Sequence, residues 1–216
     1  MRTAAFIVFE GGEGSGKSTQ AKALNNRLRK LGYDVVFTHE PGGTVLGNKL
    51  RRWVKWGKDV TLPSELFLFL ASRSQLVAKV IRPALAKGYI VICDRFAAST
   101  MAYQGYGRGM DLSLLKSLND FATDGLVPDL TVLLDLDAEE GLGRKRRKWD
   151  TFEREDLTFH KKVRDGYLKM AAADAERWMV VDASLPALQV EELIWERVRE
   201  FLTYGKGFVS LATTSP

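Results

Sequence analysis

Cysteine is nearly absent from this sequence, because Cys93 in the apolar run YIVIC is the only one. A single cysteine excludes an internal disulfide, and its apolar neighbours favour a small buried core residue over a redox or metal ligand. Long apolar runs are absent too, since no stretch reaches the roughly eighteen uncharged apolar residues that span a membrane. The N-terminal stretch MRTAAFIVFE shows no cleavable signal pattern. These absences predict a cytoplasmic protein with no membrane partner.

A net positive charge outside one short segment is also missing. The formal net charge is +5, yet the segment RKRRK at residues 144–148 carries five positive charges by itself. A nucleic-acid binder distributes basic residues over a duplex-sized surface, whereas one short basic segment favours a local anion site. We therefore expect no nucleic-acid partner.

The strongest pattern present is the stretch GGEGSGKST near the N-terminus. Its spacing G-x-x-x-x-G-K-[ST] is that of a P-loop, and it lies between an apolar run and a helix-prone segment. Glycines let backbone N–H groups reach phosphate oxygens, while Lys17 and the helix N-terminus add positive charge. A flexible Gly/Ser loop that matches by chance is the alternative. The residues expected to bind nucleotide phosphates are Gly11, Gly12, Glu13, Gly14, Ser15, Gly16, Lys17, Ser18 and Thr19.

Five short runs rich in β-branched and aromatic residues predict buried strands. They lie at residues 4–9, 34–39, 89–93, 130–136 and 178–182. Longer helical patterns separate them, such as residues 18–32 and 63–88, each ended by a glycine. This alternation predicts an α/β fold, with a mostly parallel sheet, helices on both faces and the ligand at the carboxyl ends of the strands. We expect one domain over residues 1–205 and a flexible tail over residues 206–216.

A P-loop needs a carboxylate on a neighbouring strand to complete its metal site. The strand YIVIC delivers Asp94 to its carboxyl end, and Arg95 follows directly. Asp135 and Asp137 are rivals, but they precede a helix that either can cap. An ion pair between Asp94 and some other basic residue is the alternative without a metal. We expect Ser18 and Asp94 to hold Mg²⁺.

Several motifs together resemble the thymidylate kinase family. They are GGEGSGKSTQ (11–20), EPGGT (40–44), DRF (94–96), AYQG (102–105) and FEREDLTFHKKVRDGYL (152–168). The resemblance spans nearly the whole chain and implies a P-loop three-layer αβα sandwich, with a five-stranded parallel sheet in the order 2-3-1-4-5 and a small helical lid. It also implies transfer of the γ-phosphoryl group of ATP to dTMP, giving dTDP and ADP in dTTP biosynthesis, with Mg²⁺ as cofactor. It further implies a homodimer.

The same resemblance implies the residues that hold the acceptor. The arginine after EPGGT and the arginine of the Asp-Arg pair grip the acceptor phosphate in the family, and these map to Arg51 and Arg95, with Arg52 as the alternative to Arg51. Phe69 and Arg73 are four residues apart on one helix face, so a pyrimidine can stack on the ring while its carbonyl oxygen accepts from the guanidinium. Plain core packing of Phe69 and a solvated charge at Arg51 are the alternatives. The family positions that border the base and sugar are Ser99, Thr100, Tyr103 and Gln104, where the tyrosine ring crowds the 2′ position.

The basic segment resembles the lid of the bacterial members, over about residues 142–156. Because the P-loop itself holds no arginine, the resemblance implies that lid residues such as Arg144 and Arg147 act in catalysis beside Lys17 and Arg95. A solvated basic helix end is the alternative. This sequence departs from the bacterial lid pattern Asp-Arg-x-Glu, since Thr151, and not an arginine, follows Asp150. The missing arginine leaves Arg144, Arg146, Arg147 and Arg154 as candidate substitutes.

Two other functions stay open at this point. One is a kinase of the same fold that acts on another nucleotide or on a nucleoside, which would need a base for the 5′-hydroxyl. The other is a nucleotide-dependent switch without a small-molecule acceptor. The absence of an N-K-x-D motif weakens the switch.

Overall fold

The computed structural model describes residues 4–57, 59–144 and 151–204. Its centre is one sheet of five parallel strands in the order β2-β3-β1-β4-β5, which confirms the predicted order. The strands are β1 (Ala5–Gly11), β2 (Val35–His39), β3 (Ile90–Asp94), β4 (Leu130–Asp135) and β5 (Trp178–Asp182). Each lies within two residues of its predicted bounds.

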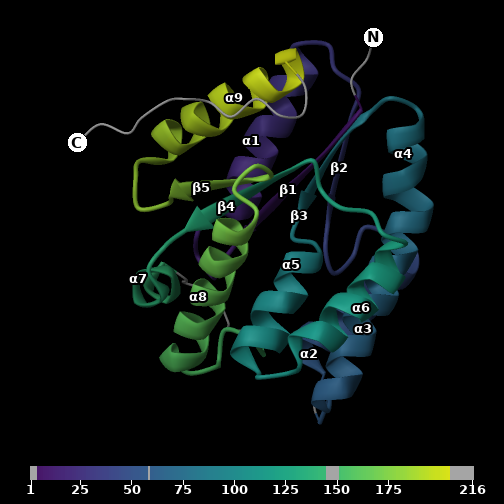
Figure 1. Cartoon of the computed structure of the whole chain (residues 1–216), viewed down its shortest axis with the longest axis vertical. Helices are drawn as coiled ribbons and strands as arrows, with labels where there is room; N and C mark the ends of the chain where they lie inside the picture. Colours follow the sequence, from purple (N-terminus) through teal and green to yellow (C-terminus); the bar gives the residue numbers. More distant parts are fainter. Residues whose placement is uncertain (1–3, 58, 145–150, 205–216) are drawn as a thin grey trace.

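Helices cover both faces of the sheet (Figure 1). Successive strand residues point to opposite faces, so Ala5, Ile7 and Phe9 pack in one core with the helices α1 (Lys17–Lys30) and α9 (Ala187–Tyr204). Phe6 and Val8 pack in a second core with α3 (Leu62–Leu76) and the segments after it. Because both faces are buried, β1 is apolar from Ala5 to Phe9 rather than alternating, as is typical of parallel sheets.

The helices that follow β1 and β2 carry several of the predicted site residues, including Lys17, Arg51 and Phe69. The helix expected over residues 63–88 is α3, followed without a break by a π-helical segment and α4. Proline at position 83 has no backbone N–H, and the wider π turn lies directly before it. These elements are α1 (Lys17–Lys30), α2 (Val45–Trp56), α3 (Leu62–Leu76), η1 (Val77–Ile81) and α4 (Arg82–Ala86).

The remaining elements follow β3, β4 and β5. They are α5 (Ala97–Thr100), the π-helical η2 (Met101–Gly107), α6 (Leu112–Thr123), α7 (Ala138–Gly143), α8 (Leu157–Ala173) and α9 (Ala187–Tyr204). Residues 151–155, the described part of the predicted lid before α8, form turns. The middle of that lid, residues 145–150, and the predicted tail lie outside the described residues.

The carboxyl ends of β1, β2 and β3 meet at one edge of the sheet. Phe9 is in register with Asp94, and Asp94 is in register with His39 on the other side. The P-loop therefore leaves β1 beside the end of β3. The sheet order alone brings the two predicted phosphate and metal motifs together.

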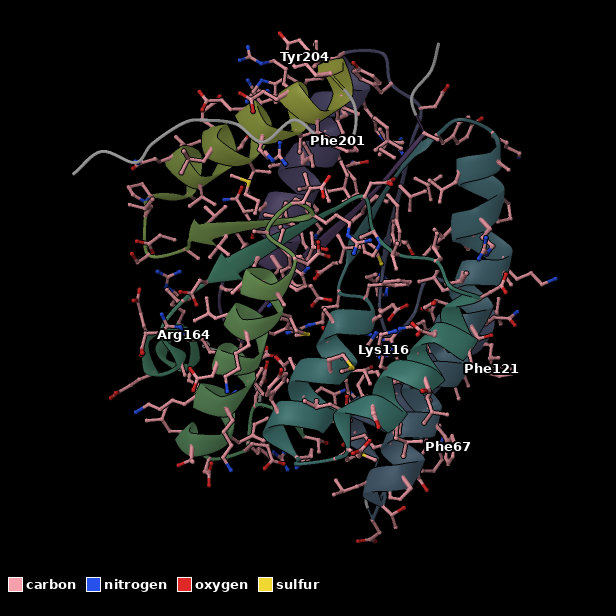
Figure 2. The ribbon with its side chains drawn as sticks, in the orientation of Figure 1. Phe67, Lys116, Phe121, Arg164, Phe201 and Tyr204 are labelled. Carbon is pink, nitrogen blue, oxygen red and sulfur yellow. The ribbon has the colours of Figure 1, made fainter. Side chains whose placement is uncertain are left out.

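Two large aromatic side chains stand on the outer helical surface (Figure 2). Phe67 of α3 is 61% exposed and Phe121 of α6 is 87% exposed, and α3 packs against α6. Among the described helices, none combines the length and apolar character needed to cross a membrane.

Candidate active site

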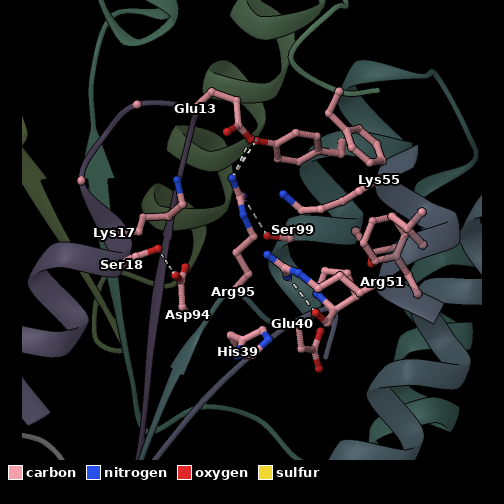
Figure 3. Close-up of a pocket in the computed structure, with 18 of the residues that line it drawn as sticks. Glu13, Lys17, Ser18, His39, Glu40, Arg51, Lys55, Asp94, Arg95 and Ser99 are labelled. Atoms are coloured by element: carbon pink, nitrogen blue, oxygen red, sulfur yellow. Dashed lines mark hydrogen bonds and ion pairs between the residues drawn. The ribbon is translucent and has the colours of Figure 1, made fainter. Parts of the chain in front are cut away.

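A cavity of about 540 Å³ lies at the carboxyl edge of the sheet (Figure 3). Its walls come from the P-loop, α1, α2, α3, η2 and the ends of β2 and β3. The predicted site residues that line it are Glu13, Gly14, Gly16, Lys17, Ser18, Thr19, Arg51, Phe69, Asp94, Arg95, Ser99, Thr100, Tyr103, Gln104 and Arg144. Gly11, Gly12, Ser15 and Arg73 do not line it, and Arg147 lies outside the described residues.

The ammonium group of Lys17 is held inside the P-loop. Its Nζ donates to the carbonyl oxygen of Gly12 at 2.5 Å and to the hydroxyl of Ser15 at 3.2 Å. Burial, and then the positive charge of Arg95, lower the pKa of Lys17 from 10.5 to about 8. A bound anion would oppose both effects and raise the pKa of Lys17, because it stabilises the charged form. The loop is therefore arranged to receive negative charge.

The Ser18 hydroxyl donates to the carboxylate of Asp94, across from the start of α1 to the end of β3 (Figure 3). The two rivals of Asp94 are engaged elsewhere. Arg164 of α8 donates to both carboxylate oxygens of Asp135, at 2.7 and 2.9 Å. Asp137 caps α7 by accepting from the backbone N–H groups of Glu139 and Glu140. The structure thus brings Asp94, and neither rival, to the P-loop serine.

Ser18 and Asp94 suit Mg²⁺, a hard cation that takes oxygen ligands and commonly only one or two protein carboxylates. In the described part of the chain, no group of three or more His, Cys, Asp and Glu side chains gathers to form a fuller cage. Nucleotide phosphates and water would complete the shell of an ion held here.

Arg95 reaches into the middle of the cavity from a backbone with φ of 73°. This left-handed conformation is strained for a non-glycine residue, and surrounding contacts must offset the strain. The guanidinium donates to Glu13 at 2.8 Å, to the Tyr103 hydroxyl at 3.1 Å and to the hydroxyls of Ser99 and Tyr167, each at 3.3 Å. The acid of the P-loop and the arginine of the Asp-Arg pair are therefore directly joined.

A fully buried acid, Glu10, is hydrogen-bonded to the segment that follows Arg95. Its carboxylate accepts from the N–H groups of Phe96 and Ser99, from the Ser99 hydroxyl at 2.6 Å and from the Tyr167 hydroxyl at 2.8 Å. Burial raises the pKa of Glu10, although Arg95 and these hydrogen bonds oppose the shift. Sequence analysis missed Glu10 and Tyr167. A lone acid at the end of an apolar strand was the available signal.

Phe69 lines the cavity, but Arg73 lies behind the wall and is only 1% exposed. Each of its three guanidinium nitrogens already donates. Their acceptors are the carboxylate of Glu40, the hydroxyl of Thr100, the side-chain oxygen of Asn119 and the carbonyl oxygen of Phe96. Arg73 thus holds two cavity residues, Glu40 and Thr100, in place. Contact between Arg73 and a base carbonyl would require the exchange of one of these bonds.

Glu40 faces the cavity from the other side of this ion pair. Burial raises the pKa of Glu40 to about 7 against the opposing charge of Arg73. Its Oε1 is buried and has no hydrogen-bond partner in the described part of the chain. The EPGGT motif therefore contains a buried carboxylate oxygen whose hydrogen-bonding capacity is not satisfied.

Two further predicted cations line the cavity but point at backbone atoms. Arg51 donates to the carbonyl oxygen of Pro41 at 2.8 Å. Arg144 donates to the carbonyl oxygen of Ala183 at 3.0 Å and pairs with Glu140 one turn earlier in α7. These contacts are not made with the P-loop, so an anion that binds either guanidinium would compete with them.

The ring of Tyr103 closes the cavity on the α8 side. It packs edge-on against Phe152, Phe159 and Tyr167, and its hydroxyl donates to Glu13 at 2.8 Å. Beside it, the side-chain amide of Gln104 donates to the buried Glu65 at 2.9 Å. A rigid aromatic wall next to the P-loop acid is well placed to limit the size of a bound sugar.

Comparison with known proteins supplies an independent result. Residues 9–194 match the family model described as thymidylate kinase. The chain is 52% identical to the thymidylate kinase of Dehalococcoides mccartyi, over 91% of this chain and 97% of the relative. It is 47% identical to that of Thermomicrobium roseum, over 93% and 97%. The crystal structure of thymidylate kinase from Ehrlichia chaffeensis superposes with a TM-score of 0.76 at 36% identity, covering 91% of this chain and 99% of that one.

Proposed function

The chain belongs to the thymidylate kinase family, and on that premise we propose how its cavity transfers the γ-phosphoryl group of ATP to dTMP, giving dTDP and ADP. Membership of the family makes it an ATP-dependent nucleoside monophosphate kinase and removes the switch as an alternative. The observation that carries the assignment of the site is the contact of the donor and acceptor motifs in one cavity. Lys17, Ser18 and Asp94 of the donor side line the same cavity as Arg95 and Phe69 of the acceptor side.

The reaction needs charge stabilisation more than proton transfer. The acceptor oxygen belongs to a phosphate whose second pKa is about 6, so it is largely ionised near neutral pH. We propose that Lys17 binds the β and γ phosphates of ATP while Arg95 and Arg51 bind the acceptor phosphate. These contacts place the two oxygens in line and offset their repulsion. Arg144 and Arg147 remain candidates for the lid charge.

Ser18 and Asp94 would hold Mg²⁺, directly or through water. The ion, when bound, neutralises charge on the β and γ phosphate oxygens. Glu13, Tyr103 and Ser99 keep the Arg95 guanidinium aimed into the cavity, which lowers the entropy cost of binding the acceptor.

We also propose how the base and sugar are bound. The ring of Phe69 would stack on thymine, with Thr100 and Gln104 beside it, and Tyr103 would exclude a 2′-hydroxyl. Base reading by Arg73 stays a prediction, since its present partners favour a supporting role. A homodimer and a cytoplasmic location also stay predictions from sequence.

The test is ADP production from ATP and Mg²⁺ with dTMP, dUMP, dCMP, dGMP and thymidine in parallel. We expect strong turnover with dTMP and weak or no turnover with thymidine, because the nucleoside lacks the phosphate that Arg51 and Arg95 bind. Lys17→Ala should lower kcat/KM at least about 10³-fold.

Lys30→Ala supplies the control, since Lys30 is an exposed lysine on the same helix. It should leave kcat/KM within about twofold of the wild type. Comparable turnover of thymidine and dTMP would contradict the proposed acceptor site, and full activity of Lys17→Ala would contradict the donor site.

A further inference from the structure

Thr151 stands where the bacterial lid pattern has its arginine, and its contacts show what the chain does instead. The backbone N–H of Thr151 donates to the carbonyl oxygen of Lys55 at 3.3 Å, and its hydroxyl donates to the same oxygen at 3.0 Å. Lys55 lies 96 residues earlier, in the last turn of α2. The residue that replaces the arginine is therefore hydrogen-bonded to the backbone of Lys55.

Lys55 belongs to the cavity. It follows Arg51 by four residues, so the two side chains leave the same face of α2, and both line the cavity. Figure 3 shows the Lys55 side chain extending into the cavity, with its ammonium end toward Arg95 and Ser99. The lysine is thus presented from the side opposite the P-loop.

The positive charge of Lys55 acts on His39, which also lines the cavity. Burial lowers the pKa of His39, and the positive charges of Arg51 and Lys55 lower it further. The carboxylate of Asp94 acts in the opposite direction. Arg51 and Lys55 therefore lie close enough to His39 for the charges of both to act on it.

Two of the cations predicted from the family pattern, Arg95 and Arg144, are paired with acids, so a further cation would add charge stabilisation in the cavity. Arg95 is paired with Glu13, which cancels part of its charge, and Arg144 is paired with Glu140. Thr151 can donate a hydrogen bond but carries no charge. The γ-phosphoryl group spreads negative charge over its oxygens during transfer, and cations fixed in a cavity of low dielectric stabilise that charge.

We propose that Lys55 is a catalytic cation, which contacts the acceptor phosphate and the transferring phosphoryl group and supplies the charge that Thr151 lacks. This inference rests on the proposed function. The bond from the γ phosphorus to the oxygen that bridges it to the β phosphorus breaks, and a bond from the dTMP phosphate oxygen to the γ phosphorus forms. The bridging oxygen leaves on ADP, and Lys55 keeps its proton throughout. Thr151 is a positioning residue, because it acts by holding the backbone of Lys55.

The first test compares Lys55→Met with Lys49→Met in steady-state dTMP phosphorylation. Both variants remove a lysine charge from α2, but Lys49 is exposed and does not line the cavity. We expect Lys55→Met to lower kcat about 10²-fold and to leave the KM for ATP within about twofold. Lys55→Arg, which keeps the charge, should retain most of kcat.

The second test restores the family arginine. Thr151→Arg in the Lys55→Met background should recover at least about tenfold of the lost kcat, because it returns a cation to the same region. Thr151→Val should lower kcat with little change in the KM for ATP, as expected of a positioning residue. Thermal unfolding of every variant separates loss of catalysis from loss of fold, and Lys55→Gln provides the neutral variant if Lys55→Met does not fold.

The inference is overturned if folded Lys55→Met, or Lys55→Gln in its place, stays within twofold of Lys49→Met in kcat. It is also overturned if a neutral and a charged residue at position 55 perform equally. Failure of the proposed function looks different, because the wild type itself would then produce no ADP in response to dTMP.

Discussion

At the scale of single residues, Lys17 couples the donor site to pH. Its pKa is lowered to about 8 by burial and by Arg95, so the free enzyme loses this charge as the pH rises through about 8. ATP binds the charged form, and its phosphates raise the pKa of the bound lysine. The pH sensitivity of the free enzyme should therefore exceed that of the complex with ATP.

We expect kcat/KM for ATP to fall above about pH 8, approaching tenfold per pH unit, while kcat at saturating ATP falls only at higher pH. Profiles measured from pH 6.5 to 10 under fixed ionic strength check this. Lys17→Arg should flatten the alkaline limb of its own profile, because a guanidinium keeps its charge. A wild-type kcat/KM that stays level from pH 7 to 9.5 would show that Lys17 does not govern nucleotide capture.

At the scale of elements, the backbone of α7 is in close contact with the backbone of the P-loop. A Cβ atom on Gly141 would collide with the carbonyl oxygen of Glu13, and one on Gly14 would collide with the carbonyl oxygen of Gly141. Gly14 also has a φ of 70°, which side chains rarely adopt. The two backbones can approach this closely only because both residues are glycine. Any shift of α7 must therefore move the P-loop.

Gly141→Ala should displace the P-loop and lower kcat/KM for ATP by about tenfold or more, since misplacement of about 1 Å can cost 10²-fold. Gly143→Ala is a matched control on the same helix, because no heavy atom lies within 4 Å of the added methyl group. Steady-state kinetics with varied ATP, together with thermal unfolding of both variants, provide the measurement. Equal kinetics for the two variants would mean that the P-loop tolerates the contact.

At the scale of the whole molecule, the α3–α6 surface is the strongest candidate for contact with a second copy. Phe67 and Phe121 are well exposed there, and large aromatic side chains are enriched in protein interfaces (Figure 2). The core uses the other side of α3, where Leu66, Leu70 and Leu76 are buried. The apolar side chains of α3 are therefore divided between the core and the surface.

If the homodimer forms through this surface, Phe121→Asp should shift the protein toward a monomer in sedimentation velocity. Burying an unpaired carboxylate in an apolar interface is costly. Leu188→Asp on α9 supplies the control, since Leu188 is 77% exposed and lies on the opposite side of the sheet. A wild type that sediments as a monomer at all concentrations would argue against the homodimer.

Much of the fold and part of the site follow from local sequence. The P-loop spacing, the apolar strands and the acid at the end of YIVIC are short-range patterns, because a strand or a helix is set by residues within a few positions of one another. They determined the α/β class, the parallel sheet, and Lys17, Ser18 and Asp94 as neighbours at its carboxyl edge. The family resemblance added the sheet order and the acceptor residues.

Only the tertiary structure decided which side chains meet across long separations. It brought Asp94 into hydrogen-bond contact with Ser18 and paired Asp135 with Arg164. It also buried Arg73 behind the cavity wall and hydrogen-bonded Thr151 to the backbone of Lys55. A hydrogen bond between residues tens of positions apart depends on how helices pack on the sheet, and no periodicity in the sequence records that packing. Charge and polarity are properties of residues, whereas partners and burial are properties of the fold.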